Sequence, residues 1–341
     1  MTSFKKVYIK AYTRLNVGDD LFVFLLCSRY PNVHFYIKEA LGYTDVFNSI
    51  NNLSIIKDAN NISVDAIVYI GGSIFIENSP KSLLRLHDLK EEIIKENIPT
   101  YIIGANFGPY LSNEYYSTVK NDLLSKTAST TFRDKFSFNM FKDLANVHYA
   151  ADIVFSLDTA NIRSAEKKEI GISLIHHLER ETLKKNYDNY LRKLAEISKY
   201  YIAEGYSVRL FSFCEYEKDM VAINDLCSLM TNNELEHITV SNYTGNIYMF
   251  LEDIANLKLF ITSRFHSMIL GLKFNVPIIP ICYSQKCSNV LNDMDFPKEN
   301  IYSFDTLNNL NYKKIPDVFC SPLFETALNH FNDLDIFLKE N

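Results

Sequence analysis

The chain has 341 residues, which predicts two domains because a single hydrophobic core stops growing at about 250 to 300 residues. Hydrophobic residues make up 47% of the chain and charged residues 22%, values of a globular protein that exclude a disordered one. The formal net charge of −6 excludes the dense basic surface with which proteins bind the phosphates of nucleic acid.

In the first half of the chain, short runs of β-branched and aromatic residues alternate with patterns of helical period. The runs predict strands near Lys6–Ala11, Val33–Ile37, Ala66–Ile70, Thr100–Ile103 and Ser129–Phe132. The patterns between them predict helices near Asp19–Ser28, Lys81–Glu96, Glu114–Ser125 and Lys135–Leu144. This alternation is typical of a doubly wound, mainly parallel sheet.

A polar stretch, Leu157–Lys168, loses the apolar periodicity and predicts a linker. We therefore place a first domain at 1–160 and a second at 169–320. In the second, the pattern predicts strands near Glu169–Ile175, Ser207–Phe211, His237–Val240, Leu257–Ile261 and Pro277–Ile281. It predicts helices near Tyr187–Ala203, Asp219–Met230, Ile247–Ala255, His266–Leu272 and Asn289–Met294.

The last segment, 321–341, predicts an amphipathic closing helix that packs back across the domains. The amino terminus enters a strand at once and lacks the apolar stretch of a signal peptide. No segment approaches the roughly 18 uninterrupted apolar residues of a spanning helix. We therefore expect a cytoplasmic protein, and contact with the inner face of the cell membrane stays an open alternative.

Ligands of open α/β sheets bind beyond the carboxyl ends of the strands, so the residues just after each strand are the candidates for a site. Asn16, Gly18 and Asp19 follow the first strand. Gly18 permits a tight turn into the helix, and Asn16 can bond backbone or ligand. A favourable helix start explains Asp19 equally well.

Three later strand ends of the first domain carry glycine and polar residues. Gly72 and Ser73 follow the third strand, where a missing side chain lets a ligand or a second backbone approach. Asn106, Gly108 and Tyr110 stand in the loop after the fourth. Arg133 follows the fifth and suits either a surface ion pair or an anion site.

The second domain repeats the arrangement. His176 and His177 follow its first strand, and Glu215 lies just past its second. A later strand ends at Arg264 and His266, which supply a fork for a carboxylate or phosphate and a group that exchanges protons near neutral pH. Lys286 follows the next strand. HxH, HExxH and clustered Cys/His patterns are absent, so we predict no structural metal. We also predict no cofactor.

Seven short segments occur in order along the chain: NVGDD, GGSIF at 71–75, GANFGPY, FRD at 132–134, ADIVFSL, SRFHSMILGL and YSQK. As an ordered set, they resemble the polysaccharide pyruvyl transferase family over roughly Tyr8 to Met294. The resemblance implies a GT-B-like fold, with two doubly wound parallel-sheet domains facing a central cleft. It also implies transfer of an enolpyruvyl group from phosphoenolpyruvate to a sugar hydroxyl pair as a ketal, on capsular or exopolysaccharide precursors carried by polyprenyl diphosphate. In related enzymes the Arg-x-His motif, here Arg264 and His266, bears on donor binding and catalysis.

The residue chemistry suits that reaction. Phosphoenolpyruvate carries a carboxylate and a phosphate, so Arg264, Arg133 and Lys286 are the candidate cations. His266 is the candidate acid, and the candidate bases are Asp19, His176 and His177. We add four donor-binding residues from the glycine loops, Gly72, Ser73, Asn106 and Gly108. The candidate acceptor-binding residues are Asn16, Tyr110, His176, His177 and Glu215.

Two other functions stay open. The same cleft would suit a nucleotide-sugar glycosyltransferase of GT-B architecture, for which Asp293 or Asp295 would bind ribose hydroxyls. A catalytically inert scaffold of capsule assembly is the second alternative. The loop after the fourth strand also lacks the further histidine or acidic residue of some family members, which leaves the general base unassigned.

Overall fold

The computed structural model describes residues 4–58, 62–96, 98–162, 165, 167–177 and 181–339. The chain divides into two compact units. The first contains Met1–Thr13, Asp19–Ser156 and Pro322–Asn341, and the second contains Arg14–Gly18 and Leu157–Ser321. The division after Ser156 falls at the predicted linker, of which residues 163, 164 and 166 lie outside the described residues.

One segment groups differently from the sequence-based division, and the closing segment, which was predicted separately, groups with one of the units. Arg14–Gly18 belongs to the second unit, although it precedes most of the first. The closing segment Pro322–Asn341 belongs to the first unit. Neither grouping has a signal in hydrophobic periodicity, because each depends on contacts between residues far apart in the sequence.

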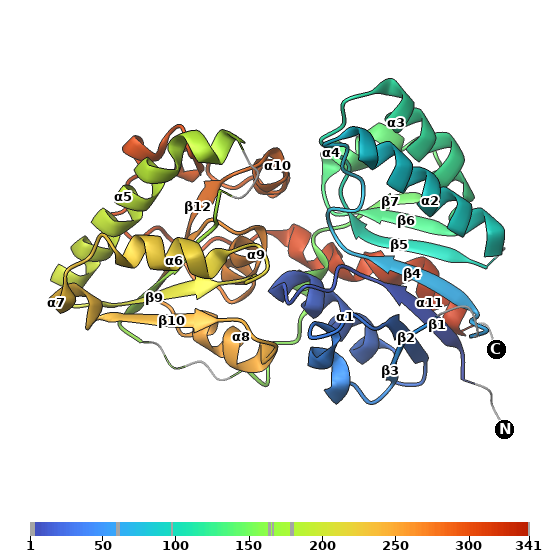
Figure 1. Ribbon diagram of the computed structural model, residues 1–341, viewed down its shortest axis with the longest axis horizontal. Coiled ribbons are helices and arrows are strands. Elements are labelled where there is room, and N and C mark those ends of the chain that lie inside the picture. The colour runs from blue at the N-terminus through green and yellow to red at the C-terminus, as the bar shows by residue number, and fades with distance from the viewer. Residues whose placement is uncertain are drawn as a thin grey trace. The chain divides into compact units, whose positions relative to one another are not determined.

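The first unit is built on a seven-stranded sheet in the order β3-β2-β1-β4-β5-β6-β7 (Figure 1). All pairings are parallel, and β1 lies between β2 and β4. Its strands are β1 (Lys6–Lys10), β2 (His34–Lys38), β3 (Leu53–Ile56), β4 (Ala66–Ile70), β5 (Thr100–Ala105), β6 (Ser129–Phe132) and β7 (Val147–Tyr149). The strand order reverses between β1 and β4, so the loops after these two strands flank a topological switch point.

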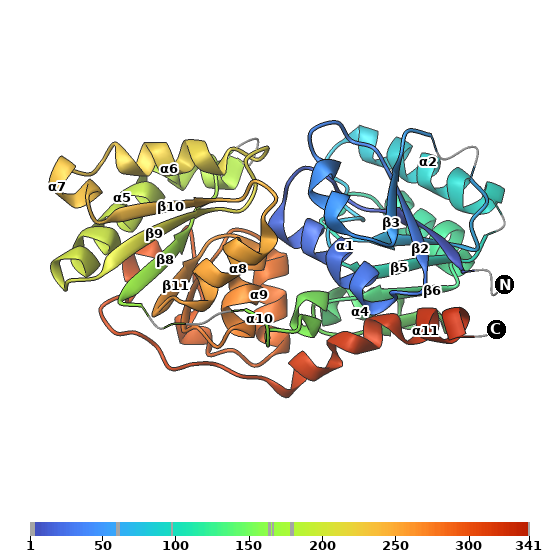
Figure 2. The ribbon, with the colours of Figure 1, turned by 90° about the horizontal axis from the view of Figure 1, so that it is seen from below.

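Helices cover both faces of this sheet. Helices α1 and α11 lie on one face, where Arg29 of α1 donates to Asp335 of α11. Helices α3 and α4 lie on the other face, where Tyr116 of α3 stacks on Phe141 of α4. Helix α11 can be followed in Figure 2. The hydroxyl of Ser129 in β6 donates to the carboxylate of Asp333 in this helix at 2.6 Å. The helices are α1 (Val17–Arg29), α2 (Pro80–Glu96), α3 (Asn113–Ser117), α4 (Lys135–Phe141) and α11 (Asn332–Lys339).

The second unit repeats the design with a six-stranded sheet in the order β10-β9-β8-β11-β12-β13. Its strands are β8 (Glu169–Ser173), β9 (Ser207–Ser212), β10 (Ile238–Asn242), β11 (Leu259–Thr262), β12 (Ile278–Cys282) and β13 (Tyr302–Ser303). Its helices are α5 (Glu181–Ala203), α6 (Asp219–Cys227), α7 (Asn232–Leu235), α8 (Ile247–Ala255), α9 (Phe265–Lys273) and α10 (Gln285–Asp293). Helices α5 and α6 lie on one side of the strands and α8 and α9 on the other (Figure 2). The reversal of strand order here lies between β8 and β11.

The central strands are buried along their whole length. Every residue of β4 and of β5 is buried, as is every residue of β8 and of β11. Strands covered by helices on both faces read as continuous apolar runs, which is why these four are the strands that the sequence predicts most clearly.

The main differences from the predicted elements are at the edges of the first sheet and in two helices. The sequence analysis does not predict β3 and β7, which are edge strands of four and three residues and have no long apolar run. The predicted helix Glu114–Ser125 is instead α3 followed by a π-helical turn, Thr118–Leu123, and a short 3₁₀ turn. The predicted closing helix is a 3₁₀ segment, Pro322–Phe331, that continues as α11.

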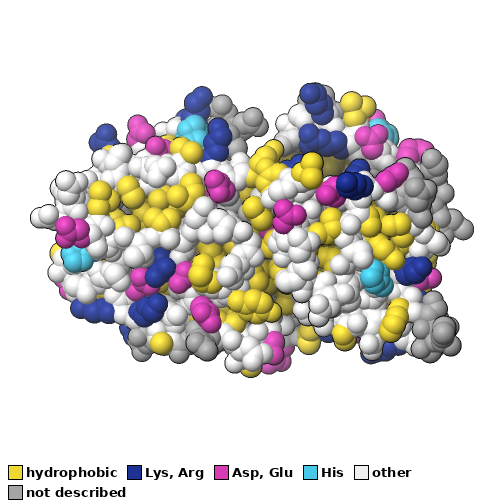
Figure 3. Space-filling view, turned by 60° about the horizontal axis from the view of Figure 1, so that its bottom comes forward, with side chains coloured by type: hydrophobic (Ala, Val, Ile, Leu, Met, Phe, Trp, Pro, Cys, Tyr) yellow, Lys and Arg dark blue, Asp and Glu magenta, His cyan; other side chains and the backbone are white. Residues whose placement is uncertain are grey.

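On the face drawn in Figure 3, acidic and basic side chains lie interspersed among hydrophobic and neutral ones. Among the described residues, no helix is both long enough and apolar enough to cross a membrane.

Candidate functional site

In the first unit, Arg133 is the centre of a buried polar cluster at the carboxyl end of β6. Its Nη1 donates to Asp152 at 2.9 Å, and its Nη2 donates to the side-chain oxygen of Asn106 at 3.0 Å. All three residues are buried. The charge of Arg133 is therefore formally neutralised, and its guanidinium is held by residues that follow two other strands, β5 and β7.

Gly72 lies directly against this guanidinium. A Cβ on Gly72 would stand 1.9 Å from Nη2 of Arg133, far inside any contact distance. The carbonyl of Gly72 also accepts from the backbone N–H of Asn106 at 2.6 Å. The glycine is required for close approach, and the predicted residues Gly72, Asn106 and Arg133 come together as one cluster.

The loop after β5 is held by two carboxylates. Asp134 caps α4 by accepting from the backbone and hydroxyl of Ser137, whose oxygen in turn accepts from Phe107 N–H. Burial raises the pKa of Asp134. Glu77 accepts from the backbone N–H groups of Leu111 and Ser112 at 2.5 and 2.8 Å. These hydrogen bonds fix the conformation of the loop at both of its ends.

Four further predicted residues lie around this edge of the first unit. Gly108 has a φ of +98°, in the region that favours glycine. Tyr110 is 37% exposed and packs its ring on Phe107, with ring centroids 4.9 Å apart. Ser73 is exposed. Asp19 stands in the first turn of α1, and its Oδ1 would lie 3.8 Å from a Cβ on Gly71.

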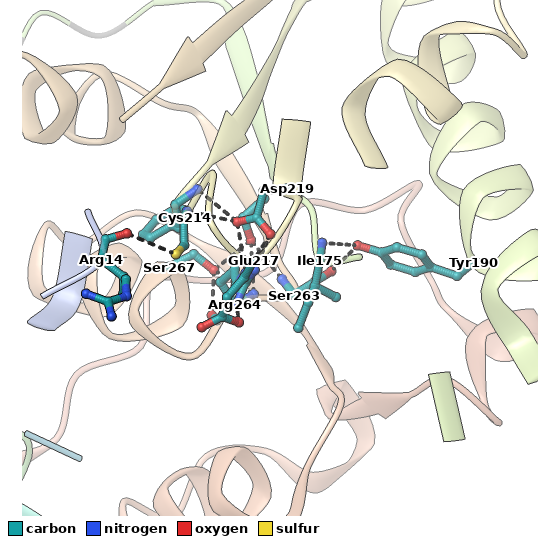
Figure 4. Close-up of polar contacts among 11 residues, drawn as sticks. Arg14, Ile175, Tyr190, Cys214, Glu217, Asp219, Ser263, Arg264 and Ser267 are labelled. Atoms are coloured by element: carbon teal, nitrogen blue, oxygen red, sulfur yellow. Dashed lines mark hydrogen bonds and ion pairs between the residues drawn. The ribbon is translucent and has the colours of Figure 1, made fainter. Parts of the chain in front are cut away.

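In the second unit, Arg264 is buried and bonded by two carboxylates (Figure 4). Its Nε donates to Asp219 at 2.9 Å, and its Nη2 is also bonded to Asp219. Its Nη1 donates to Glu217 at 2.6 Å. Burial raises the pKa of Asp219 to about 6, and Arg264 acts in the opposite direction. Burial alone would lower the pKa of Arg264, yet the two acids raise it well above its usual value.

Hydroxyl groups fix the backbone on which Arg264 stands. The oxygen of Ser173, at the end of β8, accepts from the N–H groups of Ser263 and Arg264 at 2.8 and 3.3 Å. Ser173 and Ser267 are joined by a hydrogen bond of 2.7 Å between their hydroxyls. Tyr190 of α5 donates to Ser263 at 2.9 Å, as Figure 4 shows. The turn at the switch point of this sheet is thus held by groups from one strand, β8, and two helices, α5 and α9.

His266 lies against the Asn16–Gly18 segment, which belongs to the same unit. A Cβ on Gly18 would stand 1.8 Å from Nδ1 of His266. Gly18 N–H is held by the side-chain oxygen of Asn16 at 3.1 Å, and the neighbouring Val17 N–H bonds the carbonyl of Phe213. The predicted residues Asn16, Gly18 and His266 therefore meet, although 248 positions separate the last two.

The other predicted residues of the second unit stand at different strand ends. His176 and His177, after β8, lie side by side with ring centroids 4.2 Å apart and the ring planes tilted by 31°. Glu215 is exposed and accepts from Asn242 at 3.3 Å. Lys286 places its ammonium 5.7 Å from the ring centre of Phe265, beside His266 in the chain. The described residues contain no group of three or more His, Cys, Asp or Glu side chains that could hold a metal ion.

A model of the polysaccharide pyruvyl transferase family matches residues 16–285, most of the chain. The chain belongs to this family. The matched range begins at Asn16 and contains Arg133, Arg264 and His266, the centres of the clusters described above. The predicted family is thus confirmed.

Sequence similarity to one relative in polysaccharide biosynthesis agrees with this membership of the pyruvyl transferase family. The amylovoran biosynthesis protein AmsJ of Erwinia amylovora is 24% identical over 262 residues. The match spans 69% of this chain and 60% of that protein, less than two thirds of the relative's length.

Solved structures establish the fold of this pyruvyl transferase family member. UDP-GlcNAc 2-epimerase from Methanocaldococcus jannaschii is similar with a TM-score of 0.58 at 12% identity, over 97% of this chain and 99% of that one. A putative UDP-N-acetylglucosamine 2-epimerase from Listeria monocytogenes has a TM-score of 0.59 at 9% identity, over 100% and 98%. At such identities the likeness concerns the fold alone. The fold is GT-B-like, with two doubly wound parallel-sheet units, as predicted.

The sequence analysis missed the acidic partners of both arginines. It assigned Asp219 only as a helix start and gave Glu217 no role, although both follow the end of β9. Asp152 stands in the quoted ADIVFSL segment but received no role either. Position after a strand is the signal that could have found Glu217 and Asp219, because it had already selected Glu215.

Proposed function

We propose that this protein transfers a pyruvyl group from phosphoenolpyruvate to two hydroxyls of one sugar in a polysaccharide precursor, forming a pyruvate ketal. The observation that carries this proposal is the placement of Arg264 and His266 two residues apart at the carboxyl end of β11. They lie beside the switch point of the second sheet, with the Asn16–Gly18 segment against the imidazole. Family membership supplies the reaction class.

The reaction needs two protons moved and no oxidant. One sugar oxygen adds to the central carbon of phosphoenolpyruvate while the methylene carbon gains a proton and becomes a methyl group. The second sugar oxygen then replaces the phosphate at that carbon. Of the two hydroxyl protons, one balances the methyl group and the other leaves with phosphate.

Two groups of the second unit have roles in this scheme. His266 acts as general acid toward the methylene carbon, because imidazole exchanges protons near neutral pH and Gly18 leaves it little freedom to turn. Arg264 binds an anionic group of the donor through guanidinium N–H groups that Asp219 does not use. Lys286 is the third candidate cation, and His176, His177 and Glu215 are candidate acceptor contacts.

Arg133 of the first unit is the second candidate ligand of the donor. Its support is its burial at a strand end, where the missing side chain of Gly72 leaves room for the guanidinium. Ser73, Asn106 and Gly108 would contribute to the same anion site, and Tyr110 to acceptor binding. Asp19 is a candidate base.

The acceptor is proposed to be an oligosaccharide on polyprenyl diphosphate, handled at the inner face of the cell membrane by a cytoplasmic protein. Support comes from the family and from AmsJ, which is named for the biosynthesis of amylovoran. No metal or other cofactor is proposed.

The decisive experiment is incubation with phosphoenolpyruvate and a panel of carrier-linked sugars, followed by mass spectrometry of the acceptor and assay of released phosphate. Wild-type protein should add the mass of a ketal with one phosphate released for each ketal. Replacing His266 by Ala should lower the rate by roughly a hundredfold or more, as loss of a general acid does. His237→Ala, an exposed histidine of the same unit, is the matched control. Transfer of a sugar from a nucleotide-sugar donor, with no ketal, would refute the proposal.

A further inference from the structure

The two acids at Arg264 occupy different edges of its guanidinium. Asp219 takes the side edge, where it is bonded to Nε and Nη2. Glu217 bonds Nη1, at the tip of the side chain, at 2.6 Å. The tip, with its two Nη atoms, is the edge that a bound carboxylate or phosphate could still engage in a forked contact.

The two acids are also held differently. The Asp219 side chain is fully buried and accepts from the backbone N–H groups of Phe213 and Cys214, both at 3.1 Å. The Glu217 side chain is 20% exposed and stands in the turn that precedes α6. Asp219 is therefore built into the fold, whereas Glu217 approaches Arg264 from the solvent side.

We propose that Glu217 is an internal competitor at Arg264, a carboxylate that occupies the anion-binding tip until an anionic substrate displaces it. Asp219 is a positioning residue that holds the guanidinium by its side edge throughout. The inference rests on the proposed binding of an anionic donor at Arg264 and adds the group with which the donor exchanges.

The formal charges favour a substrate anion that replaces Glu217 over one that binds in addition to it. With one guanidinium and two carboxylates ionised, the trio carries a formal charge of −1. An anion added to this trio meets net repulsion, whereas an anion that replaces Glu217 meets a neutral pair of Arg264 and Asp219. Glu217 also satisfies Nη1 while the site is empty, which avoids an unpaired buried donor.

The test compares Glu217→Gln with the wild-type protein by calorimetric titration of phosphoenolpyruvate. The glutamine oxygen can still accept from Nη1, but its charge no longer competes. We expect the Kd to fall about fivefold, equivalent to about 1 kcal/mol. In turnover assays KM should fall while kcat stays close to wild type, because Glu217 leaves the tip before the reaction begins.

Glu236→Gln is the matched control, since Glu236 is an exposed acid of the same unit at the end of α7. Its Kd should equal that of the wild type, so that a change in net charge alone is excluded. An unchanged or higher Kd for Glu217→Gln would overturn the inference.

The failure of this inference is distinguishable from that of the proposed reaction. If phosphoenolpyruvate binds but no ketal forms, the proposed reaction is wrong. The ratio of the Kd of the wild type to that of Glu217→Gln still decides the role of Glu217. If phosphoenolpyruvate does not bind, inorganic phosphate replaces it in the same titration. Tighter phosphate binding by Glu217→Gln than by the wild type supports the role of Glu217 as a competitor. Absence of phosphate binding by both proteins overturns that role.

Discussion

Each unit buries an arginine at the end of a parallel strand, but the two arginines are neutralised differently. Arg133 and Arg264 each follow a strand of a parallel sheet, and each is buried. Arg133 is bonded by one carboxylate and one amide, so Arg133 and Asp152 together are neutral. Arg264 is bonded by two carboxylates and its trio is negative.

The difference shows that a buried arginine at a strand end is not by itself a ready anion site. What a ligand meets depends on the number of carboxylates around the guanidinium and on whether one of them can leave. The backbone of Gly72 lies against the guanidinium of Arg133. The guanidinium of Arg264 is instead approached from the solvent side by the carboxylate of Glu217. Three predictions test how far this contrast holds.

The largest expected effect is the loss of stability when either arginine is removed. Breaking a buried ion pair leaves uncompensated charge, and we expect about 3 kcal/mol for Arg133→Met and about 5 kcal/mol for Arg264→Met, which strands two acids. Urea unfolding followed by circular dichroism measures both, since the chain has no Trp. Adding Asp219→Asn to Arg264→Met should restore part of the loss. Equal losses of stability in Arg133→Met and Arg264→Met would show that the number of carboxylates around the arginine makes no difference.

A second contrast is the pH response of the first unit, which has a buried neutral histidine beside its arginine cluster. His330 Nε2 must donate to the carbonyl of Ala151, and its Nδ1 accepts from Thr131, both at 2.7 Å. Burial lowers the pKa of His330 to about 4. The unfolded chain protonates first as pH falls, so stability present above about pH 6.5 is lost toward pH 4.

The size of this loss follows from the shift. Between pH 7 and pH 4, His330 should remove about 3 kcal/mol from the free energy of unfolding. His330→Gln should flatten that slope even though it costs stability at pH 7, and His87→Gln, an exposed histidine of the same unit, should leave the slope intact. A slope that survives in His330→Gln would assign the acid sensitivity to other groups.

The smallest expected effect concerns the two close glycines. Gly18→Ala should displace the imidazole of His266, and Gly72→Ala should displace the guanidinium of Arg133. Displacing a reacting or binding group by about 1 Å costs about a hundredfold in rate, so we expect that loss in kcat/KM for ketal formation in each variant. Gly42→Ala is the control, since its φ of +75° makes the substitution cost stability, whereas no non-neighbouring atom lies within 4 Å of the added Cβ and kcat/KM should not change. Near-normal rates in Gly18→Ala would show that the position of His266 is not critical.

The sequence by itself determined the parallel α/β class, most buried strands and the family. Strands such as β4 and β8 are buried on both faces, so their apolar runs are visible without any knowledge of the neighbours. Arg133, Arg264 and His266 were selected as candidates because the ends of parallel strands are where ligands bind, a rule that needs only the order of elements.

Only the tertiary structure decided what surrounds those residues. The contact of Gly18 with His266, the grouping of Pro322–Asn341 with the first unit, and the two acids at Arg264 all join segments remote in the chain. Periodicity reports which face of an element is buried, but it carries no information on which distant side chain meets it. The set of charges around Arg264 is therefore a property of the fold, whereas the presence of that arginine at a strand end is a property of the sequence.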